Sequence, residues 1–298
     1  MPTRTIRQAP TTSNPMPTEP SPSPQIFVNC IWTERLAERR EHLETVLAAV
    51  SSDPRFVINW TGSLDVEAAA FDGYIREDAP PCAGLPEWRA WIDLRRNVQT
   101  TLGSSRRRST VIAYVAAGWN RLKRNRLSIP DDAGRNRHDV DDITRKHLLG
   151  IKKFLASDAI WLLALEDDAI GTQGWESKVL DITSRLGSAS ERGIYVAASE
   201  GAGLVRTSSD PEPDDLGLFA VEPPTTRTAC AYLIDRPAAE ALTAILAETG
   251  VRSGTGVDHL LSFLLKRIAA TAFWTEPELF AHGSEHGLFR STNVPRQD

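Results

Sequence analysis

The strand–helix–strand pattern at residues 26–60 constrains the fold of this chain more than any other segment. Residues 26–31 form a short apolar run that is typical of a buried strand. Residues 34–50 carry apolar side chains at helical spacing, Asp53-Pro54 ends that helix, and residues 55–60 resemble a second strand. Two strands joined through a helix can lie parallel in one sheet. The sequence therefore predicts an α/β fold with an open, mostly parallel, twisted sheet flanked by helices.

The same alternation resumes after residue 141 and continues to residue 268. Asp141 or Asp142 is a candidate cap for a helix that ends near residue 155, and Pro237 suits the first turn of another helix. The tail from Thr275 is expected to be a loop, and so are residues 78–92 and 200–217. Helices are predicted at 110–122, 175–186 and 258–268, and strands at 160–165, 193–198 and 228–234.

Composition limits the domain organisation and the classes of function. We expect one domain over residues 25–298, preceded by a disordered Pro-, Ser- and Thr-rich leader at residues 1–24. A net charge of −5 argues against general nucleic-acid affinity. The three scattered cysteines argue against a disulfide framework and a zinc site. No apolar stretch reaches the ~20 residues needed to cross a membrane. A cytoplasmic protein is expected, with room for peripheral membrane contact.

An acidic triplet, Glu166-Asp167-Asp168, directly follows the apolar strand at 160–165. In an open parallel sheet, ligands bind outside the carboxyl ends of the strands. Clustered carboxylates repel each other by up to ~4 kcal/mol per close pair at an effective dielectric of 20. A divalent cation such as Mn²⁺ or Mg²⁺ removes that cost, and it could neutralise a nucleoside-diphosphate leaving group. The alternative is a local one, in which the acidic residues only stabilise the turn or helix that follows.

Four segments in the same order resemble the family 25 glycosyltransferases, the lipooligosaccharide and collagen galactosyltransferase group with a GT-A fold. The resemblance departs from the family pattern at Lys146, where a serine is usual, and it is weak over residues 60–140. It implies transfer of a sugar from a nucleotide-sugar donor, with UDP-sugars favoured, to a hydroxyl acceptor such as a glycan or lipooligosaccharide. A divalent metal and inversion at the sugar are also implied. The similar segments are residues 27–40, 147–168, 228–239, and 257–259 with 274–291.

The resemblance assigns the metal and nucleotide roles to the acidic triplet and to the tail. Asp168 is expected to be the principal metal ligand. Glu166 or Asp167 is expected to contact the donor ribose or a metal-bound water, and both are candidate donor-binding residues. His282 is the favoured further metal ligand, with His286 as the second candidate, because neutral imidazole binds Mn²⁺. A surface-loop histidine is the simpler interpretation of either.

Other candidate site residues come from the helix near residue 258 and from the first two strands. Asp258 is expected to act as the general base that deprotonates the acceptor hydroxyl, although it could equally be a helix N-cap. Asn29, Ile31, Arg35 and Asn59 lie at or near the ends of the first two strands, where a nucleotide would sit. Each of them is also compatible with ordinary loop structure.

Two alternatives from other functional classes remain open. Basic clusters at 106–108 and 121–126 could bind nucleic acid, although a solvated face or an anionic-acceptor groove explains them too. A catalytically silent GT-A-like protein that binds carbohydrate or nucleotide would keep the same motifs.

Overall fold

The computed structural model describes residues 25–69, 74–76, 79, 137–187, 193–201, 204, 206 and 210–289. The predicted leader at 1–24, nearly all of the loop at 78–92, the helix at 110–122 and both basic clusters lie outside these residues. So does part of the loop at 200–217.

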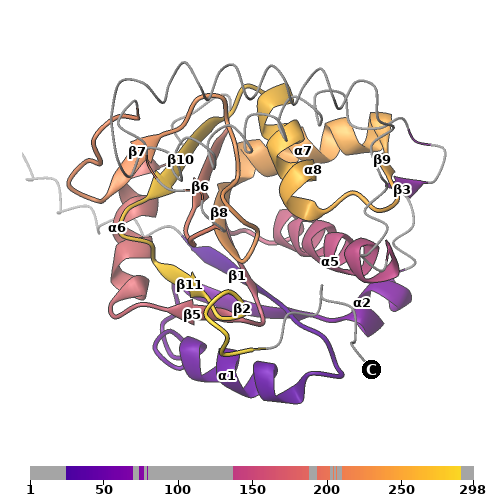
Figure 1. Cartoon of the computed structure of the whole chain (residues 1–298), viewed down its shortest axis with the longest axis horizontal. Coiled ribbons are helices and arrows are strands. Elements are labelled where there is room, and N and C mark those ends of the chain that lie inside the picture. Colours follow the sequence, from indigo (N-terminus) through magenta and orange to yellow (C-terminus); the bar gives the residue numbers. More distant parts are fainter. Residues whose placement is uncertain are drawn as a thin grey trace, which may run out of the picture.

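A seven-stranded open sheet forms the centre of the described fold (Figure 1). Three of its six pairings are parallel, β2 with β1, β1 with β4, and β6 with β10, and the other three are antiparallel. The sheet is therefore mixed. In spatial order the strands are β2 (Phe56–Thr61), β1 (Ile26–Ile31), β4 (Trp161–Glu166), β8 (Ala231–Asp235), β6 (Ile194–Ala197), β10 (Thr271–Thr275) and β7 (Leu218–Ala220).

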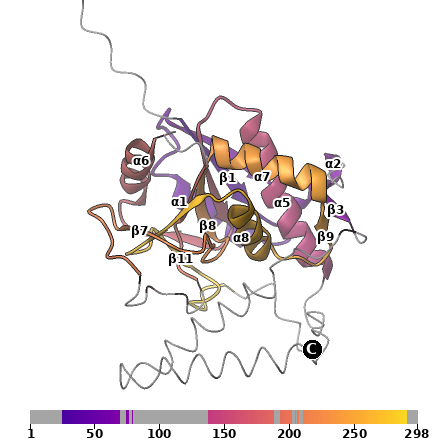
Figure 2. The ribbon, with the colours of Figure 1, turned by 90° about the horizontal axis from the view of Figure 1, so that it is seen from above.

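Helices cover both faces of this sheet, as Figures 1 and 2 show. Alternate side chains of each central strand point to opposite faces, so Phe27 packs with α5 and its neighbours, while Ile26 and Val28 pack toward α1 and α6. One face carries α5 (Arg137–Leu155), α7 (Arg236–Thr249) and α8 (Val257–Arg267), and the other carries α1 (Ala37–Leu47) and α6 (Trp175–Leu186). The predicted α/β fold, an open sheet flanked by helices, is confirmed.

Smaller elements lie around this frame. The short helix α2 (Ser63–Ala68) follows β2. Strand β5 (Ala169–Gly171) pairs with β11 (Phe280–His282), and β3 (Ile75–Arg76) pairs with β9 (Val251–Arg252). The tail after Thr275 was expected to be a loop, which is wrong at β11. Pairing with β5 supplies the backbone hydrogen bonds that this short segment could not specify alone.

The helix that precedes β4 begins earlier than predicted. It starts at Arg137, so Asp141 and Asp142 lie inside α5 and neither caps it. Asp141 instead accepts a hydrogen bond from the backbone N–H of Gly254, at 2.7 Å, and Asp142 forms an ion pair with Lys146 at 2.8 Å. Both carboxylates serve tertiary contacts, which is why a cap prediction based on neighbouring residues failed.

Strand register brings the ends of three strands together. Ile31, the last residue of β1, pairs with Thr61 of β2 and with Glu166 of β4. Strand β8 runs antiparallel to β4 and begins beside its end, with Ala231 opposite Leu165. The carboxyl end of β4 therefore meets the start of β8 at one edge of the sheet. Among the described residues, no helix is long and apolar enough to span a membrane.

Candidate functional site

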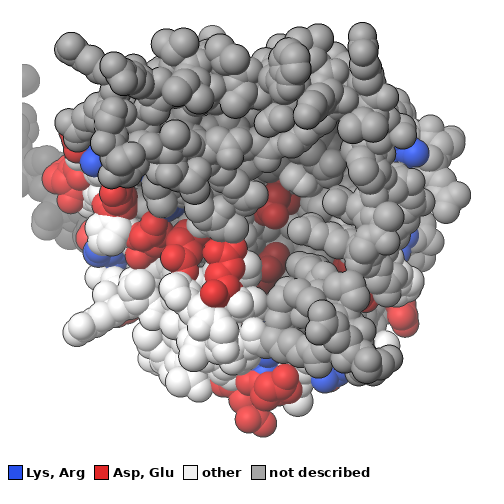
Figure 3. Space-filling model, in the orientation of Figure 1, with Lys and Arg blue, Asp and Glu red and all other residues white. Residues whose placement is uncertain are grey.

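A pocket opens at this edge of the sheet. Its apolar wall comes from the segment that joins β1 to α1 and from α5. In Figure 3, Asp and Glu side chains gather across the middle of the molecular face. The polar residues that line the pocket are Thr33, Arg39, Lys146, Glu166, Asp167, Asp168, Thr228, Asp258, His282 and Ser284.

The carboxylate of Asp168 lies against the tail. Its Oδ2 atom is 3.2 Å from Nε2 of His282, and the Ser284 hydroxyl donates a hydrogen bond to the same oxygen. The backbone N–H of Gly283 donates to the carbonyl of Asp168 at 2.9 Å. A Cβ atom on Gly283 would lie 2.8 Å from that carbonyl oxygen, so a residue without a side chain permits this approach. The tail is thus held directly on Asp168.

Electrostatics within the Asp168–His282 pair favour its charged form. Burial raises the pKa of Asp168, but hydrogen bonds from His282 and Ser284 and the imidazolium charge outweigh it, so the pKa lies below its usual value. Burial lowers the pKa of His282, but the hydrogen bond and charge of Asp168 raise it to about 9. Asp168 and His282 therefore lie in contact, while their role as metal ligands stays a prediction.

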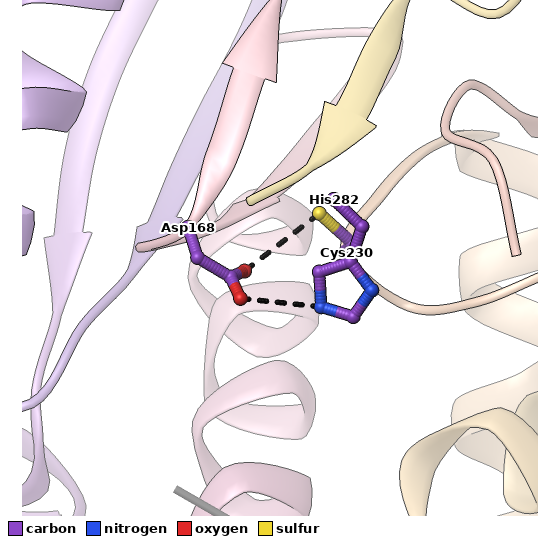
Figure 4. Close-up of side chains that lie close together, drawn as sticks. All are labelled: Asp168, Cys230 and His282. Atoms are coloured by element: carbon purple, nitrogen blue, oxygen red, sulfur yellow. Dashed lines mark hydrogen bonds and ion pairs between the residues drawn. The ribbon is translucent and has the colours of Figure 1, made fainter. Parts of the chain in front are cut away.

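Cys230 completes a group of possible metal ligands, although the scattered cysteines in the sequence argued against a zinc site. Its sulfur lies 3.8 Å from Oδ1 of Asp168, and the thiol is fully buried (Figure 4). One ligand atom from each of Asp168, Cys230 and His282 lies within 4.8 Å of the others. Burial and then the charge of Asp168 raise the pKa of the Cys230 thiol well above its usual value.

Asp167 turns away from Asp168 toward α1. Its Oδ1 atom accepts a hydrogen bond from Nη1 of Arg39 at 2.9 Å, and both side chains are about nine-tenths buried. Burial raises the pKa of Asp167 to about 6, against the opposing hydrogen bond and charge of Arg39. Arg39 lies within residues 27–40, one of the segments that resemble the glycosyltransferase family, but no site role was predicted for it.

Glu166 joins a hydrogen-bonded chain that leads into the core. Its Oε1 atom lies 3.1 Å from Nε2 of His147, and Nδ1 of the same imidazole lies 3.1 Å from the hydroxyl of Tyr232. The ring of Tyr232 stacks on those of His147 and Tyr195. His147 is buried within this chain, as expected of a structural histidine, and it also orients a carboxylate that lines the pocket.

Asp258 lies in the first turn of α8 and lines the same pocket. The N-cap of α8 is Gly256, so the alternative that Asp258 caps this helix is wrong. The charge of Asp258 contributes to the raised pKa values of Cys230 and of Tyr232, in each case after burial, the largest cause. Asp258 therefore lines the same pocket as the acidic triplet.

The four predicted donor-binding residues from the first two strands do not lie together. Ile31 lines the pocket. The Oδ1 atom of Asn29 accepts a hydrogen bond from Asn59 Nδ2 at 2.7 Å, and Asn29 packs against Gly150 of α5. These two side chains therefore link β1 to β2, and neither lines the pocket. Arg35 is exposed and forms an ion pair with Asp139 at 3.6 Å. The second histidine candidate, His286, is also apart from Asp168, because it pairs with Glu200.

Neither a protein-family model nor a curated protein sequence matches this chain.

Proposed function

We propose that this chain is a divalent-metal-dependent glycosyltransferase of the GT-A type, using a nucleotide-sugar donor, with UDP-sugars favoured, and a hydroxyl acceptor such as a glycan. One observation carries the proposal. Asp168 and His282, far apart in the sequence, meet at 3.2 Å in a pocket at the carboxyl end of β4. Such strand ends are where α/β sheets bind nucleotides.

The donor set fits a divalent cation. Asp168 and His282 would hold Mn²⁺ or Mg²⁺, and the imidazole favours Mn²⁺ because Mg²⁺ prefers oxygen ligands. When bound, the ion would neutralise the charge that develops on the nucleoside-diphosphate leaving group. The contact between Asp168 and His282 holds both side chains together in advance. Metal binding would displace the imidazolium proton of His282, because only the neutral ring can be a ligand.

The chain's own residues supply the remaining chemistry. Ile31, Trp32 and Leu36 form an apolar wall suited to the nucleoside part of the donor. Glu166, oriented by His147, is a hydrogen-bond acceptor for a ribose hydroxyl. Asp258 faces the same pocket from α8 and takes the proton from the acceptor hydroxyl in an inverting transfer.

The test is a thermal-shift panel of nucleoside diphosphates and nucleotide sugars, with and without Mn²⁺, on the wild type and on Asp168→Asn. A ligand at 100 times its Kd adds about 2.7 kcal/mol of stability, so even weak donors register. We expect Mn²⁺-dependent stabilisation by one nucleotide series, and its loss in Asp168→Asn. If no nucleotide stabilises the wild type, or the variant responds equally, the proposal is wrong.

A second variant separates transfer from binding. Asp258→Asn is expected to keep Mn²⁺-dependent donor binding while losing roughly 100-fold or more in turnover. A catalytically silent binding protein would show donor binding without turnover in the wild type. Thermal unfolding controls for the loss of a first-turn acidic residue, which costs only about 0.3–1 kcal/mol.

A further inference from the structure

The side chains of Asp168, Cys230 and His282 converge from three separate parts of the fold (Figure 4). Asp168 follows β4, Cys230 immediately precedes β8, and His282 ends β11. A carboxylate, a thiol and an imidazole in one group differ from the oxygen-rich donor set of a magnesium site. Sulfur and nitrogen donors are those that zinc and its neighbours in the transition series prefer.

Two distances within this group approach those of tetrahedral zinc. Usual zinc bond lengths place tetrahedral oxygen and nitrogen ligands about 3.3 Å apart, and oxygen and sulfur ligands about 3.5 Å apart. The structure has 3.2 Å between Asp168 Oδ2 and His282 Nε2, and 3.8 Å between Asp168 Oδ1 and Cys230 Sγ. A small rotation of the Asp168 carboxylate would place one of its oxygens at these distances from both His282 Nε2 and Cys230 Sγ. The fourth position would be available to a ligand in the pocket, which Asp168 and His282 line.

The surroundings hold these ligands in place, as outer-shell groups do in zinc sites. Oε1 of Glu285 lies 3.4 Å from Nδ1 of His282. A carboxylate at this position would accept the Nδ1 proton, so that Nε2 is free to bind a metal. The Ser284 hydroxyl donates to the carboxylate of Asp168. The backbone carbonyl of Cys230 accepts from the N–H of Glu166 at 2.8 Å, which ties the cysteine to the end of β4.

Cys230 is the residue that distinguishes one metal from another. It is fully buried, so a ligand role requires that the metal displace the thiol proton. Zinc deprotonates a coordinating thiol outright, whereas Mg²⁺ retains its waters and takes oxygen ligands. With Mg²⁺ in the site, Cys230 stays a neutral neighbour. With Zn²⁺ in the site, the Cys230 thiolate becomes a ligand.

We propose that Asp168, Cys230 and His282 form a Zn²⁺ site, with Glu285 as the outer-shell partner of the histidine. The site goes beyond the proposed transferase activity, since it requires neither donor nor acceptor. Because Asp168 and His282 are shared, Zn²⁺ competes with Mn²⁺ for this position.

Metal binding to the full-length, reduced, chelator-treated protein tests the site without any nucleotide. Zn²⁺ affinity is measured by competition with a chromogenic chelator, and Co²⁺ replaces Zn²⁺ for absorption spectroscopy. We expect one tightly bound Zn²⁺ per chain, unaffected by millimolar Mg²⁺, and a sulfur-to-cobalt charge-transfer band. Cys230→Ser should abolish that band and weaken Zn²⁺ binding beyond the roughly 10- to 100-fold that loss of an outer-shell partner costs. Glu285→Gln should weaken it by about 10-fold.

Cys30→Ser is the matched control, because Cys30 is also a buried free thiol but lies within β1. It should keep both the band and the affinity. If Cys230→Ser does not fold, His282→Gln, whose side chain is 19% exposed in the wild type, must show the same loss of Zn²⁺ affinity.

A wild-type protein without the band, or a band that persists in Cys230→Ser, overturns the assignment, as does unchanged Zn²⁺ affinity in either variant. Failure of the transferase proposal is separate, because it is read from nucleotide binding. Cys30→Ser, which lies outside the metal group, should keep Mn²⁺-dependent nucleotide stabilisation if that proposal holds.

Discussion

Replacing Arg39 with methionine tests how the acidic triplet is held in place. The Arg39–Asp167 pair has side chains only 6% and 11% exposed and a Nη1–Oδ1 distance of 2.9 Å. Breaking a buried ion pair from one side leaves an uncompensated charge and costs about 3–5 kcal/mol. Methionine keeps an apolar stem of similar length but removes the guanidinium, which lies 5.4 Å from the centre of the Phe289 ring. We therefore expect Arg39→Met to lower the free energy of unfolding by about 3–5 kcal/mol at pH 7.5.

The loss should depend on pH, and its sign follows from the pKa of Asp167. Folding raises that pKa from 3.8 to about 6, even with Arg39 present. A carboxyl with a raised pKa favours the folded state at low pH, and this stability, about 3 kcal/mol here, is lost as pH rises through the window from about 4 to 6. Without Arg39 the folded-state pKa of Asp167 rises further. The variant therefore loses stability over a wider range of pH. Its deficit relative to the wild type is therefore smaller at pH 5 than at pH 7.5.

Urea unfolding at pH 5 and pH 7.5 in metal-free buffer measures both effects. Arg39→Met combined with Asp167→Asn should recover much of the loss, because no buried charge remains unpaired. Arg55→Met is the matched control, since its pair with Asp53 is on the surface, and it should leave the transition unchanged. A deficit below about 1 kcal/mol at pH 7.5, the range of surface pairs, would refute the reasoning. So would an equal deficit at both pH values.

Two further predictions concern other buried carboxylates. Asp235→Ala should lower the free energy of unfolding by about 2–4 kcal/mol, measured by urea titration, because Asp235 Oδ1 accepts from both Ala238 N–H, as the cap of α7, and Ile194 N–H. An unchanged midpoint would contradict this role. In metal-free protein, Asp168→Asn should lower the pKa of His282 from about 9 to its ordinary range or below, because burial then acts without the opposing charge. Titration by NMR of the imidazole measures this, and a pKa that stays near 9 would show that another group sets it.

Local patterns predicted much of the secondary structure. The helix at residues 175–186 was predicted at the same bounds as α6, and the apolar runs at 26–31 and 160–165 became β1 and β4, the latter one residue later. These segments can be predicted from the sequence because the spacing of their apolar residues repeats along the segment. Strand β11 has only three residues and forms through its partner β5, so no local pattern marks it.

The spacing of apolar residues predicts neither the direction of a strand in the sheet nor the partners of a side chain. An apolar run reads alike in a parallel or an antiparallel strand, so β8 was not recognised as antiparallel to β4. Asn29 ends up against Gly150 rather than in the pocket because the alternation of β1 turns its side chain toward α5.

At the site, the order of residues alone predicts that three carboxylates lie at the carboxyl end of an apolar strand. The resemblance added His282 as a candidate partner of Asp168. Only the tertiary structure shows that the Arg39 guanidinium forms an ion pair with Asp167 and that the Cys230 sulfur lies beside the Asp168 carboxylate. The reason is that local periodicity reports which side chains are buried, whereas the identity of their partners depends on strand register between segments distant in the chain.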